Sequence, residues 1–297
     1  MSVSEFDLDL LLDDRIGAYT ALVQQFREAG VSAVPDVSVV IPAYNESGRI
    51  LPTLFSRLDH FTTRRISHEI IVVDDGSRDS TAALVREVSR RLTSVRLICL
   101  PSNMGKGAAV RAGVRNASGE LVLIEDADGA TPISEFDSLQ AAIERGSDIA
   151  IGSRQPSEHT RVERRLKRWI MGRTFALLVN GWAVPGIADT QCGFKLFRSD
   201  VARRIFALQR MNGFSFDVEL LRIARVLGFS ISEVPINWAD VAGSKVNLVR
   251  DSLRMLWDVL RIPGVVRKSL QRESARALPA GAPKALLLRG PESNTGR

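Results

Sequence analysis

The sequence contains few cysteines and no sign of a secretory signal. Cys99 and Cys192 are the two cysteines among 297 residues, too few for a disulfide framework and without the paired spacing of a zinc site. We expect two reduced thiols in a cytosolic protein. The N-terminus is acidic where a secretory signal would be basic. The chain has three histidines, and the sequence alone gives His159 no catalytic role.

Long apolar runs and aromatic residues are also scarce. No uninterrupted apolar run reaches the roughly 18 residues of a membrane-spanning helix, so any reaction with a lipid is predicted to take place from the membrane surface. Aromatic residues make up 6% of the chain and are not interleaved with basic residues as in proteins that stack bases. The net charge of +6 therefore favours phosphates or an anionic membrane surface as partner, and no nucleic acid.

Three apolar runs, each followed by a polar turn, indicate the fold class. They cover residues 37–41, 69–73 and 121–124. Pro42 ends the first run, because proline cannot donate to a sheet ladder. Strand, turn, helix and strand again is the pattern of a parallel sheet covered by helices. Since such sheets bind ligands at the carboxyl ends of their strands, we expect the polar turns to lie along one edge.

Two of these turns are acidic. Asp126 and Asp128 follow the third run, one residue apart, and Asp74 and Asp75 follow the second. Hard carboxylate oxygens on a turn suit a Mg²⁺ or Mn²⁺ ion that also holds substrate phosphates. A lone Asp-x-Asp sequence is more often a solvated turn, and it is the second acidic turn that favours a metal site here.

Four motifs resemble those of family 2 nucleotide-sugar glycosyltransferases in type and order, namely Val39–Glu46, Val72–Ser77, Asn103–Gly107 and Asp126–Asp128. The resemblance covers roughly residues 36–262. Within the family, Asp126–Thr131 and Asp189–Lys195 resemble the dolichyl-phosphate β-glucosyltransferases. The implied fold is α/β and GT-A-like, with a Rossmann-related, mixed and mainly parallel sheet flanked by helices.

The resemblance implies a metal-dependent inverting hexosyltransferase. Its expected reaction moves glucose from UDP-glucose to a polyprenyl (dolichyl-type) phosphate, and its expected partners are the nucleotide-sugar donor, the lipid phosphate and an anionic membrane surface. The expected location is cytoplasmic, peripheral on the cytoplasmic face of the membrane. One alternative is a transferase that uses GDP-mannose or a soluble small acceptor. The other is a non-catalytic nucleotide-sugar-binding protein, against which the intact Asp126-Ala127-Asp128 sequence argues.

The same motifs imply the residues of the donor site. Asp126 and Asp128 are the expected metal ligands and catalytic residues, because a divalent ion on the departing diphosphate stabilises the transition state more than the ground state. Asp128 is expected to bind the ion directly, and Asp126 either to bind it or to contact the ribose. Contacts to the nucleotide sugar are expected at Pro42, Tyr44, Glu46, Asp74, Asp75, Lys106, Arg154 and Lys245. Plainer roles stay open for some of them. Asp74 or Asp75 could cap the following helix, Lys106 could belong to a turn that starts a helix, and Lys245 could be an exposed loop lysine.

Asp189 and Asp217 are the candidates on the acceptor side. A hydroxyl acceptor needs a carboxylate base, because its oxygen must lose a proton. A phosphate monoester, with a second pKa of about 6, is already largely dianionic and needs mainly positioning and charge compensation. The two aspartates therefore stay candidates for a catalytic base or for sugar-hydroxyl binding, and Glu219 for a structural role at a helix start.

The chain divides into four predicted segments. Residues 1–35 form an N-terminal amphipathic helix, 36–240 the glycosyltransferase domain, 241–270 a loop and a basic amphipathic helix, and 271–297 a flexible tail. Basic residues beside tryptophan and aliphatics, in 161–173 and in the C-terminal helix, suit interfacial helices on anionic lipid. For 161–173, a solvated charged helix packed on the core through its apolar face is the alternative.

Overall fold

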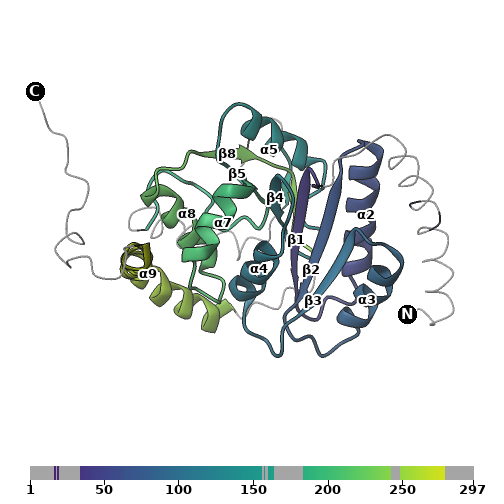
Figure 1. Ribbon diagram of the computed structural model, residues 1–297, viewed down its shortest axis with the longest axis horizontal. Coiled ribbons are helices and arrows are strands. Elements are labelled where there is room, and N and C mark those ends of the chain that lie inside the picture. The colour runs from purple at the N-terminus through teal and green to yellow at the C-terminus, as the bar shows by residue number, and fades with distance from the viewer. Residues whose placement is uncertain are drawn as a thin grey trace, which may run out of the picture.

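The structure, a computed structural model, describes most of the predicted glycosyltransferase domain and the helix that follows it (Figure 1). The described residues are 17, 19, 34–155, 157, 160–163, 183–241 and 248–277. Several predictions therefore lie outside the described residues. They concern the N-terminal helix apart from Gly17 and Tyr19, His159, the basic stretch beyond residue 163, Lys245 and the tail beyond residue 277.

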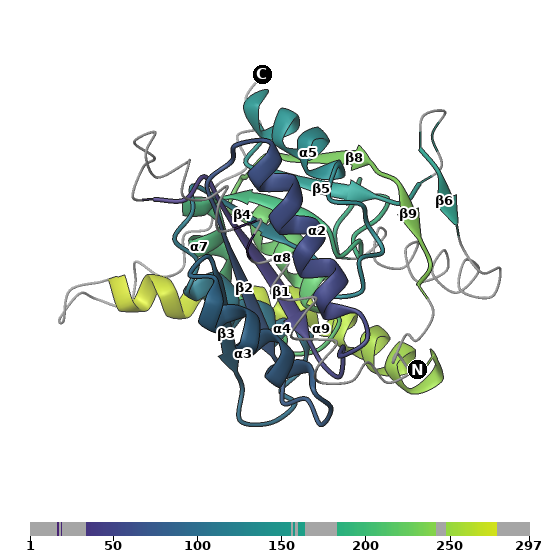
Figure 2. The same cartoon turned by 90° about the vertical axis from the view of Figure 1, so that its right-hand side faces the viewer.

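A seven-stranded sheet in the order β3-β2-β1-β4-β7-β5-β8 forms the centre of the described chain. β7 is antiparallel to both of its neighbours and all other neighbouring pairs are parallel, which confirms the predicted mixed, mainly parallel sheet. The strands are β1 (Val37–Ala43), β2 (His68–Asp74), β3 (Val95–Cys99), β4 (Leu121–Ile124), β5 (Ile149–Ser153), β7 (Lys195–Arg198) and β8 (Ile231–Pro235). Two short strands, β6 (Val162–Glu163) and β9 (Trp238–Ala239), pair in a parallel ribbon that stands beside the main sheet in Figure 2.

Helices cover both faces of the sheet (Figure 1). One face carries α2 (Ile50–Thr63), α3 (Thr81–Arg91) and α5 (Glu135–Glu144). The other carries α4 (Lys106–Arg115), α7 (Ser199–Leu208), α8 (Phe216–Val226) and α9 (Leu248–Ala277). Successive side chains of a strand point to opposite faces, so Val39 and Ile41 of β1 enter the first core while Val40 enters the second. A sheet buried on both faces explains why its strands are continuous apolar runs.

The sequence predicts that the first strand ends at Pro42, but β1 continues to Ala43. Asp75 N donates to Ala43 O, and Glu125 N donates to Val40 O. Odd-numbered residues of β1 therefore bond to β2 and even-numbered residues face β4. Because the β1–β4 register stops at Val40 opposite Ile124, the missing N–H of Pro42 leaves no ladder position unfilled.

The C-terminal helix is also longer than its sequence predicts. α9 runs from Leu248 to Ala277 and contains Pro263, so residues 271–277, expected in the tail, are helical. Proline removes one helical hydrogen bond and crowds the preceding turn. Buried Val259, Ile262 and Val266, on either side of the proline, hold the helix against α7 and α8. In the part of the chain that is described, no helix is long and apolar enough to cross a bilayer.

Candidate active site

The carboxyl ends of β1, β2 and β4 bring the predicted polar turns to one edge of the sheet. Ala43 lies opposite Asp74 in the β1–β2 register, and Val40 lies opposite Ile124 in the β1–β4 register. The chain proceeds from β1 to β2 on one side and reaches β4 on the other, so the strand order reverses at β1. Open α/β sheets bind ligands at such a reversal.

Asp75 and Asp74 shape the second turn in different ways. Asp75 Oδ1 accepts a hydrogen bond from Met104 N (2.7 Å) and Oδ2 accepts one from Gly105 N (2.9 Å), which fixes the loop before α4. Burial raises the pKa of Asp75 in spite of these two bonds. Asp74 Oδ2 accepts from Ser77 N (3.1 Å), while its buried Oδ1 has no hydrogen-bond partner among the described residues.

Neither aspartate caps α3, which was the plainer role open to them. The first residue of α3, Thr81, instead donates its backbone N–H to Asp79 Oδ1 at 3.0 Å. A buried carboxylate oxygen without a donor is energetically unfavourable. The unpaired Oδ1 of Asp74 is therefore the kind of atom that a bound ligand could satisfy, and the nucleotide contact predicted for Asp74 stays a prediction.

The turn after β1 carries Tyr44 and Glu46. Asn45 has a φ of 53° and donates its N–H to Ser77 Oγ (2.9 Å), and Glu46 N donates to Thr81 Oγ1 (2.7 Å). The Glu46 carboxylate pairs with Arg49, whose Nη2 lies 2.5 Å from Oε2. Tyr44 and Glu46, together with Pro42, thus lie at the same edge as Asp74, and the nucleotide-sugar contacts predicted for these three residues stay predictions.

Lys106 lies against the first carboxylate of the predicted metal motif. Its Nζ is 2.5 Å from Asp126 Oδ1, with 20% of the lysine side chain and 39% of the aspartate side chain exposed. Burial opposes ionisation of Asp126, but Lys106, followed by Lys195 and Arg154, outweighs it and lowers the pKa of Asp126. Burial likewise disfavours a charged Lys106, yet Asp126 and Asp217 raise its pKa. Both partners of the pair are therefore charged.

Asp128 is the less compensated carboxylate of the motif. Burial and the charge of Asp126 raise its pKa, while Ala130 N donates to its Oδ1 at 3.1 Å. Within the described ranges no group of three or more His, Cys, Asp or Glu side chains could hold a metal ion. Mg²⁺ is commonly held by one or two carboxylates together with waters and substrate phosphates. The donor set therefore fits a cation that shares its ligands with a diphosphate.

Arg154 and Asp189, predicted for the donor and acceptor sides, form an ion pair with each other. Arg154 Nε lies 2.7 Å from Asp189 Oδ2, Nη2 lies 2.8 Å from Oδ1, and Arg154 N also donates to Oδ2 (2.9 Å). Burial opposes ionisation of Asp189, but Arg154 outweighs it and lowers the pKa to about 2. The guanidinium also lies over the Trp238 ring, 5.5 Å from its centroid.

Asp217 is paired as well. Lys195 Nζ lies 2.5 Å from Asp217 Oδ1 and also donates to Cys192 O, and both charged side chains are buried. Between Cys192 and Lys195, Gly193 lies so close to Asp126 that a Cβ at this position would overlap the Asp126 carboxylate. The segment that carries Lys195 therefore also packs directly against the Asp126 carboxylate, where only glycine fits.

Residues 38–206 match the protein family described as glycosyl transferase family 2. The chain belongs to this family. It is 40% identical to a dolichyl-phosphate β-glucosyltransferase of Trichomonas vaginalis over 237 residues, which are 76% of this chain and 72% of the relative. The enzyme of the same name from Homo sapiens is 36% identical over 245 residues, 78% of this chain and 76% of the relative. The predicted glycosyltransferase class is confirmed.

Solved structures support the GT-A-like architecture of this family 2 member. Glucosyl-3-phosphoglycerate synthase of Mycobacterium tuberculosis, in complex with Mn²⁺, UDP-glucose and phosphoglyceric acid, has a TM-score of 0.58 at 18% identity, covering 84% of this chain and 83% of that one. Mannosyl-3-phosphoglycerate synthase of Rubrobacter xylanophilus has a TM-score of 0.57 at 20% identity, covering 85% and 78%. At these identities the likeness confirms the predicted fold alone.

The glycosyltransferase also contains a buried ion pair beside the predicted metal ligands that its sequence did not reveal. Arg57 of α2 is buried and donates to Glu125, with Nε 2.9 Å from Oε1 and Nη2 2.7 Å from Oε2, and Nη2 also donates to Thr131 O (3.1 Å). One turn earlier, Thr53 Oγ1 donates to Ala127 O (3.0 Å). An arginine inside the apolar stripe of a helix, as Arg57 is between Leu54 and Phe61, was the available signal.

Glu219 has the structural role that was left open for it. The side chain is fully buried, with Oε1 accepting from Arg210 N (2.9 Å) and Oε2 from Met211 N (2.7 Å). Burial raises the pKa of Glu219, although these two hydrogen bonds oppose the rise. Glu219 thereby holds the loop that precedes α8, the helix on which Asp217 lies.

Proposed function

We propose that this family 2 glycosyltransferase transfers glucose from UDP-glucose to a polyprenyl phosphate of the dolichyl type, with inversion at the anomeric carbon. Relatives at 36–40% identity over about three quarters of the chain carry the name dolichyl-phosphate β-glucosyltransferase. Their names support both the glucosyl donor and the lipid-phosphate acceptor.

One observation carries the choice of a phosphate acceptor over a hydroxyl acceptor. Both candidate bases, Asp189 and Asp217, are ion-paired, with Arg154 and with buried Lys195. The pKa of about 2 makes Asp189 a poor proton acceptor, since a general base works best with a pKa near the working pH. A phosphate dianion needs no such base, so the paired aspartates fit an acceptor that arrives already deprotonated.

Asp126 and Asp128 are the residues that would hold Mg²⁺ or Mn²⁺. When bound, the cation would neutralise charge that develops on the leaving diphosphate. Lys106 keeps its proton, because Asp126 and Asp217 raise its pKa. Its Nζ is a second positive charge available to a diphosphate beside Asp126, while Asp74 and Asp75 are proposed to contact the nucleoside.

The proposed step is a single displacement. An oxygen of the acceptor phosphate forms a bond to the anomeric carbon of glucose, the bond from that carbon to the donor phosphate breaks, and its electron pair leaves with UDP. No proton is transferred, in agreement with paired aspartates at the site. The acceptor keeps its hydrocarbon chain in a bilayer, so we place the reaction at the membrane surface, on the cytoplasmic face.

A transfer assay with the purified protein tests this function. Labelled UDP-glucose or GDP-mannose is incubated with Mn²⁺ and a long-chain polyprenyl phosphate, a short water-soluble prenyl phosphate or the corresponding prenyl alcohol. Label should move from UDP-glucose to both phosphates and not to the alcohol. Transfer to the alcohol at a similar rate would overturn the phosphate acceptor, and faster transfer from GDP-mannose would overturn the glucosyl donor.

A further inference from the structure

One face of α9 is exposed over most of the part of the helix whose side chains are described. Its exposed residues from 257 to 272 are Trp257, Leu260, Arg261, Gly264, Arg267, Lys268, Gln271 and Arg272. Their spacing of three and four residues places them on one stripe of the helix, which we call the outer stripe. Trp257 and Leu260 are 62% and 51% exposed, the highest values among the large hydrophobic side chains that are described.

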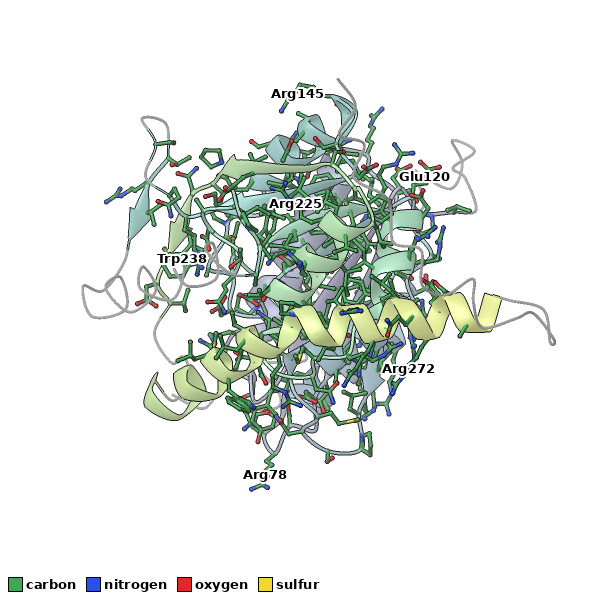
Figure 3. The ribbon with its side chains drawn as sticks, turned by 90° about the vertical axis from the view of Figure 1, so that its left-hand side faces the viewer. Arg78, Glu120, Arg145, Arg225, Trp238 and Arg272 are labelled. Carbon is green, nitrogen blue, oxygen red and sulfur yellow. The ribbon has the colours of Figure 1, made fainter. Side chains whose placement is uncertain are left out.

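The opposite face of α9 holds the helix on the protein. Val259, Ile262, Val266 and Ser269 are buried, and the first three belong to the same hydrophobic cluster as residues of α7 and α8. In Figure 3, α9 runs across the foreground. The outer stripe therefore points away from the core. No described segment of the chain covers the exposed Trp257 and Leu260, so both side chains are available for contact with a partner.

The charge on the outer stripe has one sign. Arg261, Arg267, Lys268 and Arg272 are exposed on it, and the labelled Arg272 lies on the C-terminal half of α9 in Figure 3. Between residues 255 and 272 the one acidic residue is Asp258, which is half-buried and accepts a hydrogen bond from Ser215 Oγ (3.3 Å). An exposed tryptophan and leucine among four cations fit an anionic lipid surface, where apolar groups enter the interface and cations contact headgroups.

The outer stripe is connected to the candidate active site. Ser215, the partner of Asp258, ends the loop before α8 and follows Phe214, which is 38% exposed. In the same loop, Asn212 O accepts from Gly107 N (2.8 Å) at the start of α4, next to Lys106. The loop thus links the middle of α9 to the helix that carries the lysine of the Asp126 pair.

We propose that the outer stripe of α9 docks the protein on an anionic lipid bilayer, with Trp257 and Leu260 in the interface and the four basic residues on the headgroups. This inference rests on the proposed function in one respect, because docking through α9 would bring the loop before α8, which contacts the start of α4, next to a lipid acceptor. A second copy of this chain is the rival occupant. A symmetric contact presents the same patch from both subunits, and it would bring two sets of four cations together.

The first experiment measures binding to vesicles without any donor. Vesicles of phosphatidylcholine alone, or mixed with phosphatidylserine, are sedimented with the protein and with the variant Arg261→Gln/Arg267→Gln/Lys268→Gln. The matched control, Arg90→Gln/Arg115→Gln/Arg145→Gln, removes the same charge from exposed positions elsewhere. The stripe variant should bind anionic vesicles about a hundredfold more weakly, roughly fivefold per charge, and the control should bind nearly as the parent does. Binding of the parent should weaken as salt rises.

A second experiment follows the apolar part of the stripe. Lipids brominated on the acyl chain should quench tryptophan emission of the parent, and Trp257→Phe should remove most of that quenching. Because Trp257 is exposed, the variant should unfold at the parent's temperature. Equal quenching in Trp257→Phe, or equal vesicle binding by the stripe and control variants, overturns the proposal. A dimer that Trp257→Ser/Leu260→Ser converts to monomers, with vesicle binding unchanged, would assign the stripe to a second copy.

The two proposals fail in different ways. If the parent glucosylates neither the long-chain nor the short prenyl phosphate, the proposed function is wrong, whatever the vesicles show. If it glucosylates either one, but the stripe and control variants bind vesicles equally, only the docking surface is wrong. If both hold, the stripe variant should lose transfer to the long-chain phosphate in vesicles and keep transfer to the short one.

Discussion

Replacing Arg57 by methionine should strongly destabilise the protein. The side chains of Arg57 and Glu125 are 4% and 1% exposed, and the guanidinium also holds Thr131 O. Methionine fills much of the volume but leaves the Glu125 carboxylate buried without a counter-charge. Removing one partner of a buried ion pair typically costs about 3–5 kcal/mol. For a domain of this size that corresponds to a fall in melting temperature of roughly 6–20 °C.

The loss should depend on pH in a defined direction. Burial already raises the pKa of Glu125 above its ordinary 4.5, and Arg57 opposes this rise. Without Arg57 the folded-state pKa rises further, so the folded variant binds a proton that the unfolded chain releases above pH 4.5. A group with a raised folded pKa loses stability as pH rises. The deficit of Arg57→Met should therefore be larger at pH 8 than at pH 5.

Urea denaturation followed by circular dichroism measures both effects, provided that the slope with urea concentration is unchanged. The matched control is Arg64→Met, which breaks the exposed pair of Arg64 with Asp137 (2.6 Å; 49% and 34% exposed) and should change stability by about 1 kcal/mol or less. Arg57→Met/Glu125→Leu, which removes both charges, should regain most of the loss. If Arg57→Met loses no more stability than Arg64→Met, the buried pair of Arg57 and Glu125 does not stabilise the fold.

Three further predictions concern the site. Asp128→Asn should lower the rate of transfer by roughly 10²–10³-fold, and a chelator should do the same to the parent. The control Asp200→Asn, at a side chain 73% exposed, should leave the rate unchanged. Full turnover by Asp128→Asn in the presence of chelator would exclude the metal role. In the presence of Mn²⁺, UDP-glucose at about a hundred times its Kd should stabilise the protein by about 2.7 kcal/mol in a thermal-shift assay. GDP-mannose should stabilise it less, and Asp75→Asn should reduce the shift caused by UDP-glucose. A larger shift with GDP-mannose would contradict the glucosyl assignment. Arg154 lowers the pKa of Asp189 from its ordinary 3.8 to about 2. The pair should therefore contribute about 2 kcal/mol to the free energy of unfolding above pH 3.8, and this contribution should be lost as pH falls toward 2. If the stability of Asp189→Asn depends on acid pH as that of the parent does, the pair contributes nothing.

The sheet and its polar turns could be predicted because they depend on local patterns. Buried β-branched runs such as 69–73, followed by turn residues and a helical segment, define strands and their carboxyl ends without knowledge of distant neighbours. The length of α9 could not be predicted in this way. Pro263 argues locally against a continuous helix, and packing of Val266 on the core overrides it, since tertiary contacts contribute more to a helix than intrinsic propensity.

The sequence also could not predict which charged residues of the site pair with each other. Asp189 and Asp217 could each be recognised as candidate functional residues, but their partners come from other elements, Arg154 after β5 and Lys195 on β7. A carboxylate is a base or an ion-pair partner according to what faces it, and that is decided by the fold. Arg57 was missed for the same reason, because its buried partner belongs to a different strand end.

The contact between Lys106 and Asp126 has a kinetic consequence under the proposed function. Without substrate, the ammonium group already balances the carboxylate, so a free divalent ion meets a site of reduced negative charge. A nucleotide sugar that brings its own cation offers Lys106 a new counter-charge at the moment the carboxylate is needed. The initial rate should then follow the concentration of the metal–nucleotide complex, and free metal would be a poor activator by itself. A single side chain would in this way set the order in which the reactants assemble.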